Sequence, residues 1–249
     1  MIKIRQQENK PQLERIQFNC DDIISPKLKE FGGMCEYLNK SNTTLFIGRP
    51  GSGKTSLLIN FVKKFYRKQF HHFYVFMPYS SRQSIKNNIF DKNLPEDKLF
   101  EELNEDNIAD VYNRIRASSD EGQRSLVIYD DVQKSLKNPR VLQSLKNMIA
   151  NQRHLKLVNL IMLQNFFALD KSVREIVSNI VMFNLGKSQL TKIFNEVIET
   201  NKEKFDDIRR LVYKDAHDWI FINLNTQRIW NNEFDEILYL EDDSDDENE

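Results

Sequence analysis

The sequence predicts an α/β fold, a three-layer sandwich in which helices cover both faces of a mainly parallel sheet. Three observations support this prediction. Short apolar runs of strand length recur along the chain, helical patterns follow them, and the runs end in a glycine-rich loop or in polar residues. The runs are apolar throughout, as expected for strands buried on both faces. Ligands should therefore bind where the carboxyl ends of the parallel strands meet.

The apolar run Leu45–Ile47 leads into a glycine-rich loop and then an amphipathic helix. The segment 48–55, GRPGSGKT, fits the phosphate-binding pattern of Gly, four residues and Gly-Lys-Ser/Thr. Glycines allow the loop N–H groups to point at phosphate oxygens, and the next helix presents its N-terminus to the same anion. An ordinary tight turn is the alternative. The context favours a P-loop NTPase fold, in which Lys54 reaches the β/γ-phosphates and Thr55 binds Mg²⁺.

The expected nucleotide-binding residues form one continuous stretch. They are Gly48, Arg49, Pro50, Gly51, Ser52, Gly53, Lys54, Thr55 and Ser56.

A later apolar run, 125–129, ends in two adjacent carboxylates, Asp130 and Asp131. In P-loop ATPases a buried strand delivers one Asp to Mg²⁺, and an acid beside it polarises the attacking water. Asp130 fits the metal role and Asp131 the role of catalytic base. A strand followed by a helix-capping Asp pair is the alternative, but the phosphate-binding loop upstream favours the metal and base roles.

The run Leu157–Leu163 ends at Gln164, which we expect at the carboxyl edge of the sheet. In RecA-like (ASCE) ATPases an additional strand lies between the Lys-bearing strand and the Asp-bearing strand. A polar residue at the end of that strand senses the γ-phosphate, and Gln164 is the candidate. A simple strand terminator is the alternative.

The other patterns complete the predicted domain. We expect an edge strand at 13–18, a weak helix at 23–37, strands at 73–77 and 180–183, a terminal hairpin of 219–224 and 228–230, and helices or helical stretches at 54–69, 96–103, 105–116, 139–155, 171–178 and 189–213. The predicted organisation is an N-terminal entry segment (1–42), a P-loop ATPase domain (43–232) and an acidic disordered tail (233–249).

The formal net charge of −1 conceals two oppositely charged parts. Residues 233–249 contain ten acidic residues and no Lys or Arg, which leaves 27 acidic residues against all 36 basic ones in residues 1–232. A basic body suggests a polyanionic partner, most simply nucleic acid, with a solvated Lys-rich surface as the alternative. The same two interpretations apply to a basic stripe on the first helix, formed by Lys63, Lys64, Arg67 and Lys68.

The remaining features suggest a soluble intracellular protein. Cys20 and Cys35 have no histidines at metal-ligand spacing, so we expect free thiols. Residues 1–10 lack the apolar core of a signal peptide. The most apolar segment, 157–169, is interrupted by polar residues and is too short to span a bilayer.

The chain resembles the DNA-packaging ATPases of large eukaryotic DNA viruses (poxviruses and giant viruses) and of virophages, which belong to the FtsK–HerA superfamily. The resemblance covers residues 43–230. It rests on the order and spacing of GRPGSGKT (48–55), LVIYDD (126–131), QRH (152–154), LIMLQ (160–164) and the stretch 170–179 with Arg174.

This resemblance implies ATP hydrolysis with Mg²⁺ by Lys54, Thr55, Asp130 and Asp131, with Gln164 as the polar sensor. It also implies an arginine that reaches a neighbouring subunit's nucleotide, for which Arg153 and Arg174 are both candidates and Arg174 is slightly preferred.

The implied partners and location follow from the same family. The partners are double-stranded DNA, further copies of the chain in a ring, and capsid or membrane-vertex proteins. The implied location is the host cytoplasm (the viral factory) and the virion. Lys134, Lys137 and Arg140 follow the Asp pair and are placed to couple the site to DNA.

Two other functions remain open on the sequence. A nucleoside or nucleotide kinase would need a lid with clustered arginines, whereas Arg82 is isolated and no lid is apparent. A non-enzymatic, nucleotide-dependent capsid scaffold would use the acidic segment 241–249 for docking. That segment could instead mimic DNA and cover the basic surface.

Overall fold

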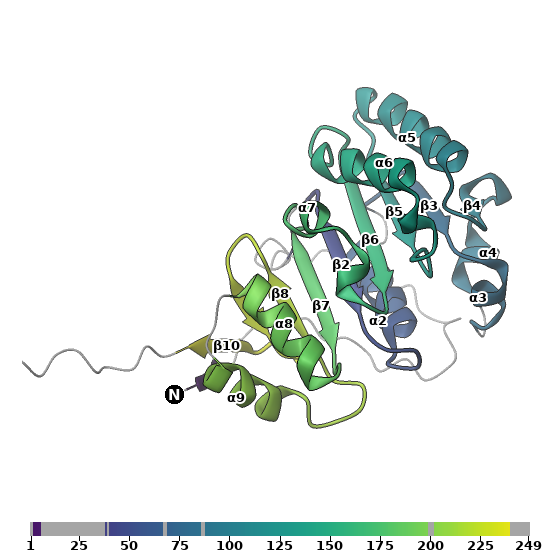
Figure 1. Ribbon diagram of the computed structural model, residues 1–249. Helices are drawn as coiled ribbons and strands as arrows, with labels where there is room; N and C mark the ends of the chain where they lie inside the picture. Colours follow the sequence, from purple (N-terminus) through teal and green to yellow (C-terminus); the bar gives the residue numbers. More distant parts are fainter. Residues whose placement is uncertain are drawn as a thin grey trace, which may run out of the picture.

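The computed structural model describes residues 2–5, 38, 40–66, 69–85, 88–198 and 202–239 of the 249-residue chain. These residues form a three-layer α/β sandwich, with helices on both faces of one large sheet (Figure 1). The predicted fold class is confirmed.

The sheet has ten strands in the order β1-β10-β9-β8-β7-β2-β6-β5-β3-β4. Six neighbouring strands, from β7 to β4, are parallel, and the remaining four extend the sheet in antiparallel fashion. The strands are β1 (Ile2–Arg5), β2 (Thr43–Ile47), β3 (His72–Phe76), β4 (Leu99–Phe100), β5 (Ser125–Tyr129), β6 (Leu157–Leu163), β7 (Asn179–Phe183), β8 (Trp219–Asn223), β9 (Arg228–Trp230) and β10 (Glu236–Tyr239). Strand β6 lies between β2 and β5, as predicted for an additional strand ending at Gln164.

The helices divide between the two faces. They are α2 (Lys54–Phe61), α3 (Tyr79–Gln83), α4 (Ile89–Asn93), α5 (Glu105–Asp120), α6 (Pro139–Ala150), α7 (Lys171–Arg174), α8 (Lys187–Val197) and α9 (Lys202–Val212), with a π-helix at Val62–Tyr66 and 3₁₀ turns at Glu96–Lys98, Ser135–Lys137 and Phe166–Ala168. Helices α5 to α9 pack into one apolar cluster, and α2, the π-helix and α4 pack into the other.

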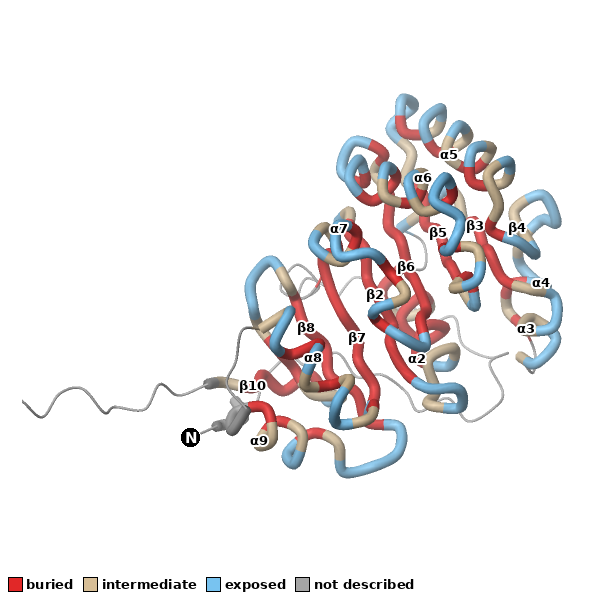
Figure 2. The backbone as a smooth tube through the Cα atoms, in the orientation of Figure 1, coloured by how far each residue is buried: buried red, intermediate tan, exposed pale blue. Residues whose placement is uncertain are grey.

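The alternation of side chains along each strand explains this division. Leu45 and Ile47 enter the cluster under α5 to α9, whereas Phe46 between them enters the cluster under α2. All three side chains are fully buried, and the central strands are buried along their whole length (Figure 2). Strands that are apolar on both faces therefore require helices on both faces.

Several predicted helices are shorter in the structure. The α-helix predicted over 54–69 ends at Phe61 and continues as a π-helix. The helix predicted over 139–155 ends at Ala150, because the chain turns into β6: Leu157 N donates to Gln152 O at 2.9 Å. The helix predicted over 171–178 ends at Arg174. The stretch 189–213 forms two helices, α8 and α9, one of the two arrangements expected.

The predicted helical stretch 96–103 is wrong. Only a 3₁₀ turn forms at its start, and Leu99–Phe100 then form β4. The strand pairs in parallel with Val75 and Phe76 of β3. Backbone pairing at the sheet edge prevails here over local helical propensity.

The prediction that residues 233–249 form a disordered acidic tail is also wrong for part of that segment. Glu236–Tyr239 form β10, which pairs with β9 and with β1. Ile237 is buried, and Arg228 forms an ion pair with Glu236, with Nη2 and Oε2 at 2.8 Å, so an acidic residue can enter the sheet. The hairpin predicted just before it is confirmed as β8 and β9. The strand predicted at 13–18, the helix at 23–37, both cysteines and residues 241–249 lie outside the described residues.

Candidate nucleotide-binding site

The loop between β2 and α2 is shaped by close backbone contacts. Gly48 N donates to Leu163 O at 3.1 Å, which fixes the loop to the end of β6. A Cβ atom on Gly48 would lie 2.5 Å from Ser52 Oγ and 3.0 Å from Phe183 Cβ, so a larger residue would displace its neighbours. Gly51 and Gly53 have φ values of 75° and 97°, in the region that favours glycine. The glycine spacing of the sequence therefore corresponds to real backbone constraints.

Lys54 lies inside this loop. Its Nζ donates to the carbonyl oxygens of Gly48, at 2.6 Å, and Arg49, at 2.9 Å. Burial lowers the pKa of Lys54, while Asp130 and Asp131 act in the opposite direction. The residues predicted from two distant motifs are thus close enough for their charges to interact.

Asp130 and Asp131 stand at the carboxyl end of β5. Asp130 N donates to Phe76 O at 2.8 Å, which holds this residue against the end of β3. Burial, and secondarily the charge of Asp131, raises the pKa of Asp130 to about 6, although Lys54 partly opposes the change. Asp131 is exposed and has a φ of 53°, so the backbone turns sharply after Asp130.

Gln164 is exposed at the end of β6, one residue after the strand that anchors Gly48. The sequence analysis missed Gln133, whose side chain lies beside it. With its amide oriented so that the oxygen faces them, Gln133 accepts hydrogen bonds from the backbone N–H groups of Gln164 and Asn165. Gln133 thus ties the segment after the Asp pair to the predicted sensor. In the sequence, only the position of Gln133 two residues after Asp131 indicated that it lies near the site.

These groups fit a nucleoside triphosphate with Mg²⁺. The Ser52 Oγ is buried in the loop without a hydrogen-bond partner, and the loop N-terminal to α2 suits an anion. Thr55 and Asp130 offer the oxygen ligands that Mg²⁺ prefers. Within the described residues no three His, Cys, Asp or Glu side chains cluster as metal ligands.

The other side of the loop holds a residue that the sequence analysis did not select. His217, just before β8, places Nδ1 3.1 Å from the carbonyl oxygen of Ser52. The Arg49 side chain lies close to the segment after β7: a Cβ atom added to Gly186 would be 3.0 Å from Arg49 Nη2. Nothing in the sequence near His217 resembled a nucleotide-binding motif, so only the fold brings it to the loop.

The two candidate arginines occupy different environments. Arg174 is engaged within its own subunit: Nε and Nη2 lie 2.7 and 3.1 Å from the carboxylate oxygens of Glu196. Its guanidinium also donates to Leu169 O and stacks over the rings of Phe166 and Phe167.

Arg153 is exposed in the turn that precedes β6. It therefore lies at the amino edge of the parallel sheet, opposite the phosphate loop. Its neighbour Gln152 confirms this placement, because its side-chain oxygen accepts from Thr43 Oγ1 at the start of β2, at 2.7 Å. Neither candidate contacts the loop of its own subunit.

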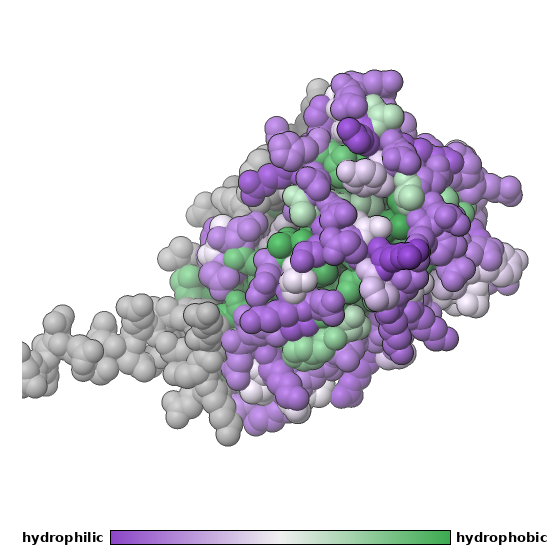
Figure 3. Space-filling view, turned by 45° about the horizontal axis from the view of Figure 1, so that its top comes forward, coloured by the Kyte–Doolittle hydropathy of each residue, from purple (hydrophilic) through white to green (hydrophobic). Residues whose placement is uncertain are grey.

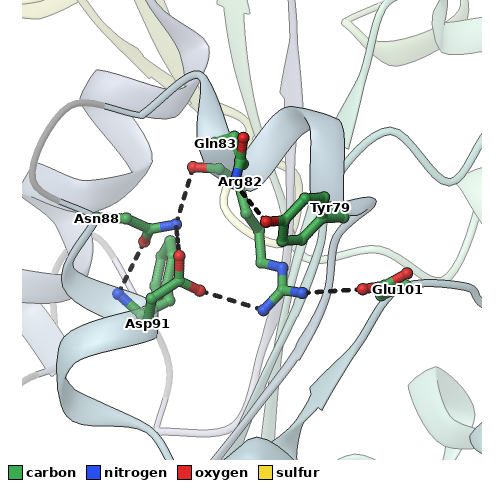
Figure 4. Close-up of polar contacts among 7 residues, drawn as sticks. Tyr79, Arg82, Gln83, Asn88, Asp91 and Glu101 are labelled. Carbon is green, nitrogen blue, oxygen red and sulfur yellow. Dashed lines mark hydrogen bonds and ion pairs between the residues drawn. The ribbon is translucent and has the colours of Figure 1, made fainter.

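Arg82 belongs to a polar cluster that joins α3, α4 and the segment after β4 (Figure 4). Its guanidinium lies 3.1 Å from Asp91 Oδ1 and 3.3 Å from Glu101 Oε1, and it also faces the ring of Tyr79. The Asn88 side chain donates to Arg82 O and to Asp91, both at 3.1 Å. Two carboxylates neutralise this arginine, so it does not offer a free charge to a phosphate.

Basic side chains follow the Asp pair on the surface. Lys134 and Lys137 are exposed between β5 and α6, and Arg140 is exposed in the first turn of α6, where its Nη1 lies 3.4 Å from Glu105 Oε2. On the π-helix, Lys63 and Lys64 are half-buried, and Arg67 and Lys68 lie outside the described residues. The face in Figure 3 is largely hydrophilic, with small, separated apolar spots. None of the helices in the described part of the chain combines the length and the apolarity needed to cross a bilayer.

Comparison with known proteins gives a family match and similarities to solved structures. A family model described as "Poxvirus A32 protein" matches residues 34–217. No curated protein matches the chain in a sequence search.

Among solved structures, the chain is similar to the genome packaging NTPase B204 of Sulfolobus turreted icosahedral virus 2 in complex with ATP-gammaS, with a TM-score of 0.61 and 15% identity over 78% of this chain and 98% of that chain. B204 described as the DNA-packaging ATPase of Sulfolobus turreted icosahedral virus gives a TM-score of 0.60 and 17% identity over the same shares of the two chains, 78% and 98%. The cytoplasmic domain of the Type VII secretion ATPase EccC of Thermomonospora curvata gives 0.50 and 14%, over 81% of this chain and 24% of that chain. At these identities the similarity shows the P-loop ATPase fold.

Proposed function

The chain belongs to the Poxvirus A32 protein family, and on this premise we propose that it is a genome-packaging ATPase that couples ATP hydrolysis to movement of double-stranded DNA into a viral capsid. The observation that supports hydrolysis best is the position of Lys54 inside the phosphate loop and within electrostatic range of Asp130 and Asp131. Nucleotide binding alone would need only the phosphate loop. The paired carboxylates add groups that suit a metal ion and a water nucleophile, which hydrolysis requires.

Each residue then has a distinct task. The loop N–H groups and Lys54 bind the phosphates, and Thr55 and Asp130 would hold Mg²⁺, which neutralises charge on the transferring phosphoryl group. Asp131 accepts a hydrogen bond from the attacking water and orients it. Gln164, held by Gln133, lies at the end of the adjacent strand, where its amide can sense the γ-phosphate.

A neighbouring subunit supplies the arginine in this proposal. Arg153 is the better candidate on the geometry, because it is exposed and lies across the sheet from its own phosphate loop. Arg174 would first have to leave Glu196. Head-to-tail contacts between copies place unlike surfaces together and form a ring when the rotation between copies closes. In this proposal the contact joins the amino edge of one subunit to the carboxyl edge of the next.

Double-stranded DNA is the polyanion that the exposed basic side chains would contact. Lys134 and Lys137 lie in the segment directly after Asp131, so a movement at the catalytic pair is transmitted to them through a few residues of backbone. Action at the viral factory in the host cytoplasm and in the virion, with capsid or membrane-vertex proteins as further partners, completes the proposal.

ATP turnover with and without duplex DNA tests it. We expect DNA to stimulate hydrolysis by the wild-type chain and Lys54→Ala to lower hydrolysis by about 10²- to 10³-fold. The double variant K134A/K137A should keep basal turnover and lose stimulation. The matched control K171A/K192A removes two exposed lysines from α7 and α8 and should be stimulated normally.

Other outcomes identify the alternatives. Transfer of the γ-phosphate to a nucleoside or nucleotide, with no effect of DNA, would establish a kinase, although the neutralised Arg82 gives that function no support. Nucleotide binding without turnover, together with loss of capsid binding when residues 241–249 are deleted, would establish a scaffold.

A further inference from the structure

A short preformed loop flanks the phosphate loop on the side away from the Asp pair. It comprises Lys214–Asp218 and leads into β8. The Asp218 carboxylate accepts hydrogen bonds from Lys214 N at 2.9 Å and Asp215 N at 2.6 Å, and its other oxygen accepts from Asn232 Nδ2 at 2.7 Å. Asp218 is itself buried. These hydrogen bonds within the chain hold the loop in this conformation.

This loop carries His217 onto the phosphate loop. Nδ1 lies 3.1 Å from Ser52 O, and a Cβ on Gly53 would lie 3.6 Å from the same nitrogen. A carbonyl oxygen can only accept, so Nδ1 must carry the hydrogen. In the neutral ring Nε2 is then an acceptor with a free lone pair, on a side chain that is exposed.

The position of His217 relative to the catalytic pair indicates which part of a nucleotide it meets. Asp130 follows β5 and Gln164 follows β6, both on one side of β2 in the sheet. His217 precedes β8, and β7 and β8 lie on the other side of β2. The γ-phosphate must face the catalytic pair, so the phosphate chain leads away from it and the nucleoside extends toward β7 and β8.

We propose that His217 recognises the nucleoside half of the bound nucleotide, with Nε2 accepting a hydrogen bond from a ribose hydroxyl or from the exocyclic amino group of the base. Hydrogen-bonding to Ser52 O sets the tautomer that makes Nε2 an acceptor. His217 is thus a specificity residue for the nucleotide rather than part of the hydrolytic machinery. The inference rests on the proposed function only in that the site binds a nucleoside triphosphate.

Equilibrium titration with two ligands tests the proposal. ATP and inorganic tripolyphosphate, each with Mg²⁺, would be titrated into the full chain and its variants. His217→Ala should weaken ATP binding about 3- to 10-fold, the value of one lost hydrogen bond, and leave tripolyphosphate binding unchanged. His217→Asn can still donate to Ser52 O through an amide in the place of Nδ1 but has no counterpart of Nε2, so it should behave like His217→Ala.

His154 provides a matched control, because it is an exposed histidine in the turn before β6, at the opposite edge of the sheet. His154→Ala should bind both ligands as the wild type does. Inosine triphosphate, which lacks the exocyclic amino group, and the 2′- and 3′-deoxy forms of ATP, which each lack one ribose hydroxyl, identify the nucleotide group that donates to Nε2. The analogue that lacks this group should bind wild type and His217→Ala equally.

Three results would overturn the inference. Equal weakening of ATP and tripolyphosphate by His217→Ala would mean that His217 only shapes the phosphate loop, and restoration by His217→Asn would mean the same. Unchanged binding of both ligands would mean no role at all. A wild-type chain that binds neither ligand would instead refute the proposed function, so the two failures are distinguishable.

Discussion

Lys54 Nζ lies 2.6 Å from the carbonyl oxygen of Gly48, the first residue after β2 and the start of the phosphate loop. The ammonium group therefore bridges the two ends of its own loop. Bound phosphates would compete with these carbonyls for the same hydrogens, so Lys54 both maintains the loop and supplies charge to the ligand.

Replacement of Lys54 by alanine should lower the rate of ATP hydrolysis by about 10²- to 10³-fold, the usual cost of removing one preorganised donor from a transition state. Steady-state phosphate release measures the effect. Lys171→Ala, on exposed α7, is the charge-matched control and should keep normal turnover. Normal hydrolysis by Lys54→Ala would contradict the proposed catalytic site.

Asp130 should make the stability of the chain depend on pH. Its folded pKa of about 6 lies above its ordinary value, so the folded state binds the proton more tightly than the unfolded state. The ionised group therefore destabilises the fold above pH 6, and the effect disappears below about pH 4, where both states are protonated. Asp130→Asn should increase the free energy of unfolding at pH 8 by about 1–3 kcal/mol.

Urea unfolding between pH 4 and 8, without nucleotide or Mg²⁺, measures this difference. Lys192→Ala, at an exposed position of α8, serves as control, with a constant difference from wild type across the range. Equal stability of Asp130→Asn and wild type at pH 8 would show that burial does not penalise the Asp130 charge. The same variant should lose ATP hydrolysis at pH 8.

Gly48→Ala and Gly51→Ala should differ in their consequences. The new Cβ at position 48 would meet Ser52 Oγ at 2.5 Å, whereas position 51 has open space and only the strain of its positive φ. We expect Gly48→Ala to cost about 1–3 kcal/mol of stability and to abolish ATP binding. Gly51→Ala should cost about 1 kcal/mol.

Adding Ser52→Ala to Gly48→Ala removes the closest clash and should restore part of the stability. The contact with Phe183 remains, so the rescue should be incomplete. Thermal unfolding and ATP titration measure both effects. A Gly48→Ala chain as stable as Gly51→Ala would mean that the loop relaxes around the added methyl group.

Subunit mixing distinguishes the two candidate arginines. A trans-acting arginine should give an inactive variant that regains turnover when mixed with inactive Lys54→Ala subunits, because some interfaces then combine an intact loop with an intact arginine. We expect this behaviour for Arg153→Ala. Arg174→Ala should instead lower the free energy of unfolding, since Arg174 pairs with Glu196. Complementation by Arg174→Ala alone would reverse this assignment.

The salt dependence of DNA binding should report on the lysines after the Asp pair. Each lost phosphate contact lowers the slope of log K against log salt concentration by about 0.9. K134A/K137A should therefore reduce the slope by about 1.8 if both side chains contact phosphate. The K171A/K192A control should leave the slope unchanged, and an unchanged slope in K134A/K137A would place the DNA surface elsewhere.

The sequence by itself determined the parts of the site that local chemistry dictates. A phosphate loop needs glycines at set positions and a lysine beside them. In the structure Gly51 and Gly53 adopt positive φ values, Gly48 packs closely against Ser52 and Phe183, and Lys54 lies inside the loop. The alternation of buried side chains dictated two layers of helices. Gln164 correctly predicted a strand between β2 and β5, since a polar residue after a buried strand marks the ligand-binding edge.

Only the tertiary structure decided which distant segments share an edge of the sheet. His217 reaches Ser52 because β8 runs antiparallel to β7, and no local pattern encodes that pairing. Gln133 supports Gln164 because β5 and β6 are neighbours in the sheet, which brings the segments after the two strands together. Glu236 joins a strand within an acidic stretch because Arg228 of β9 neutralises it. Strand pairing depends on partners far apart in the chain, so the sequence did not predict that β8 pairs with β7 or that β10 pairs with β9.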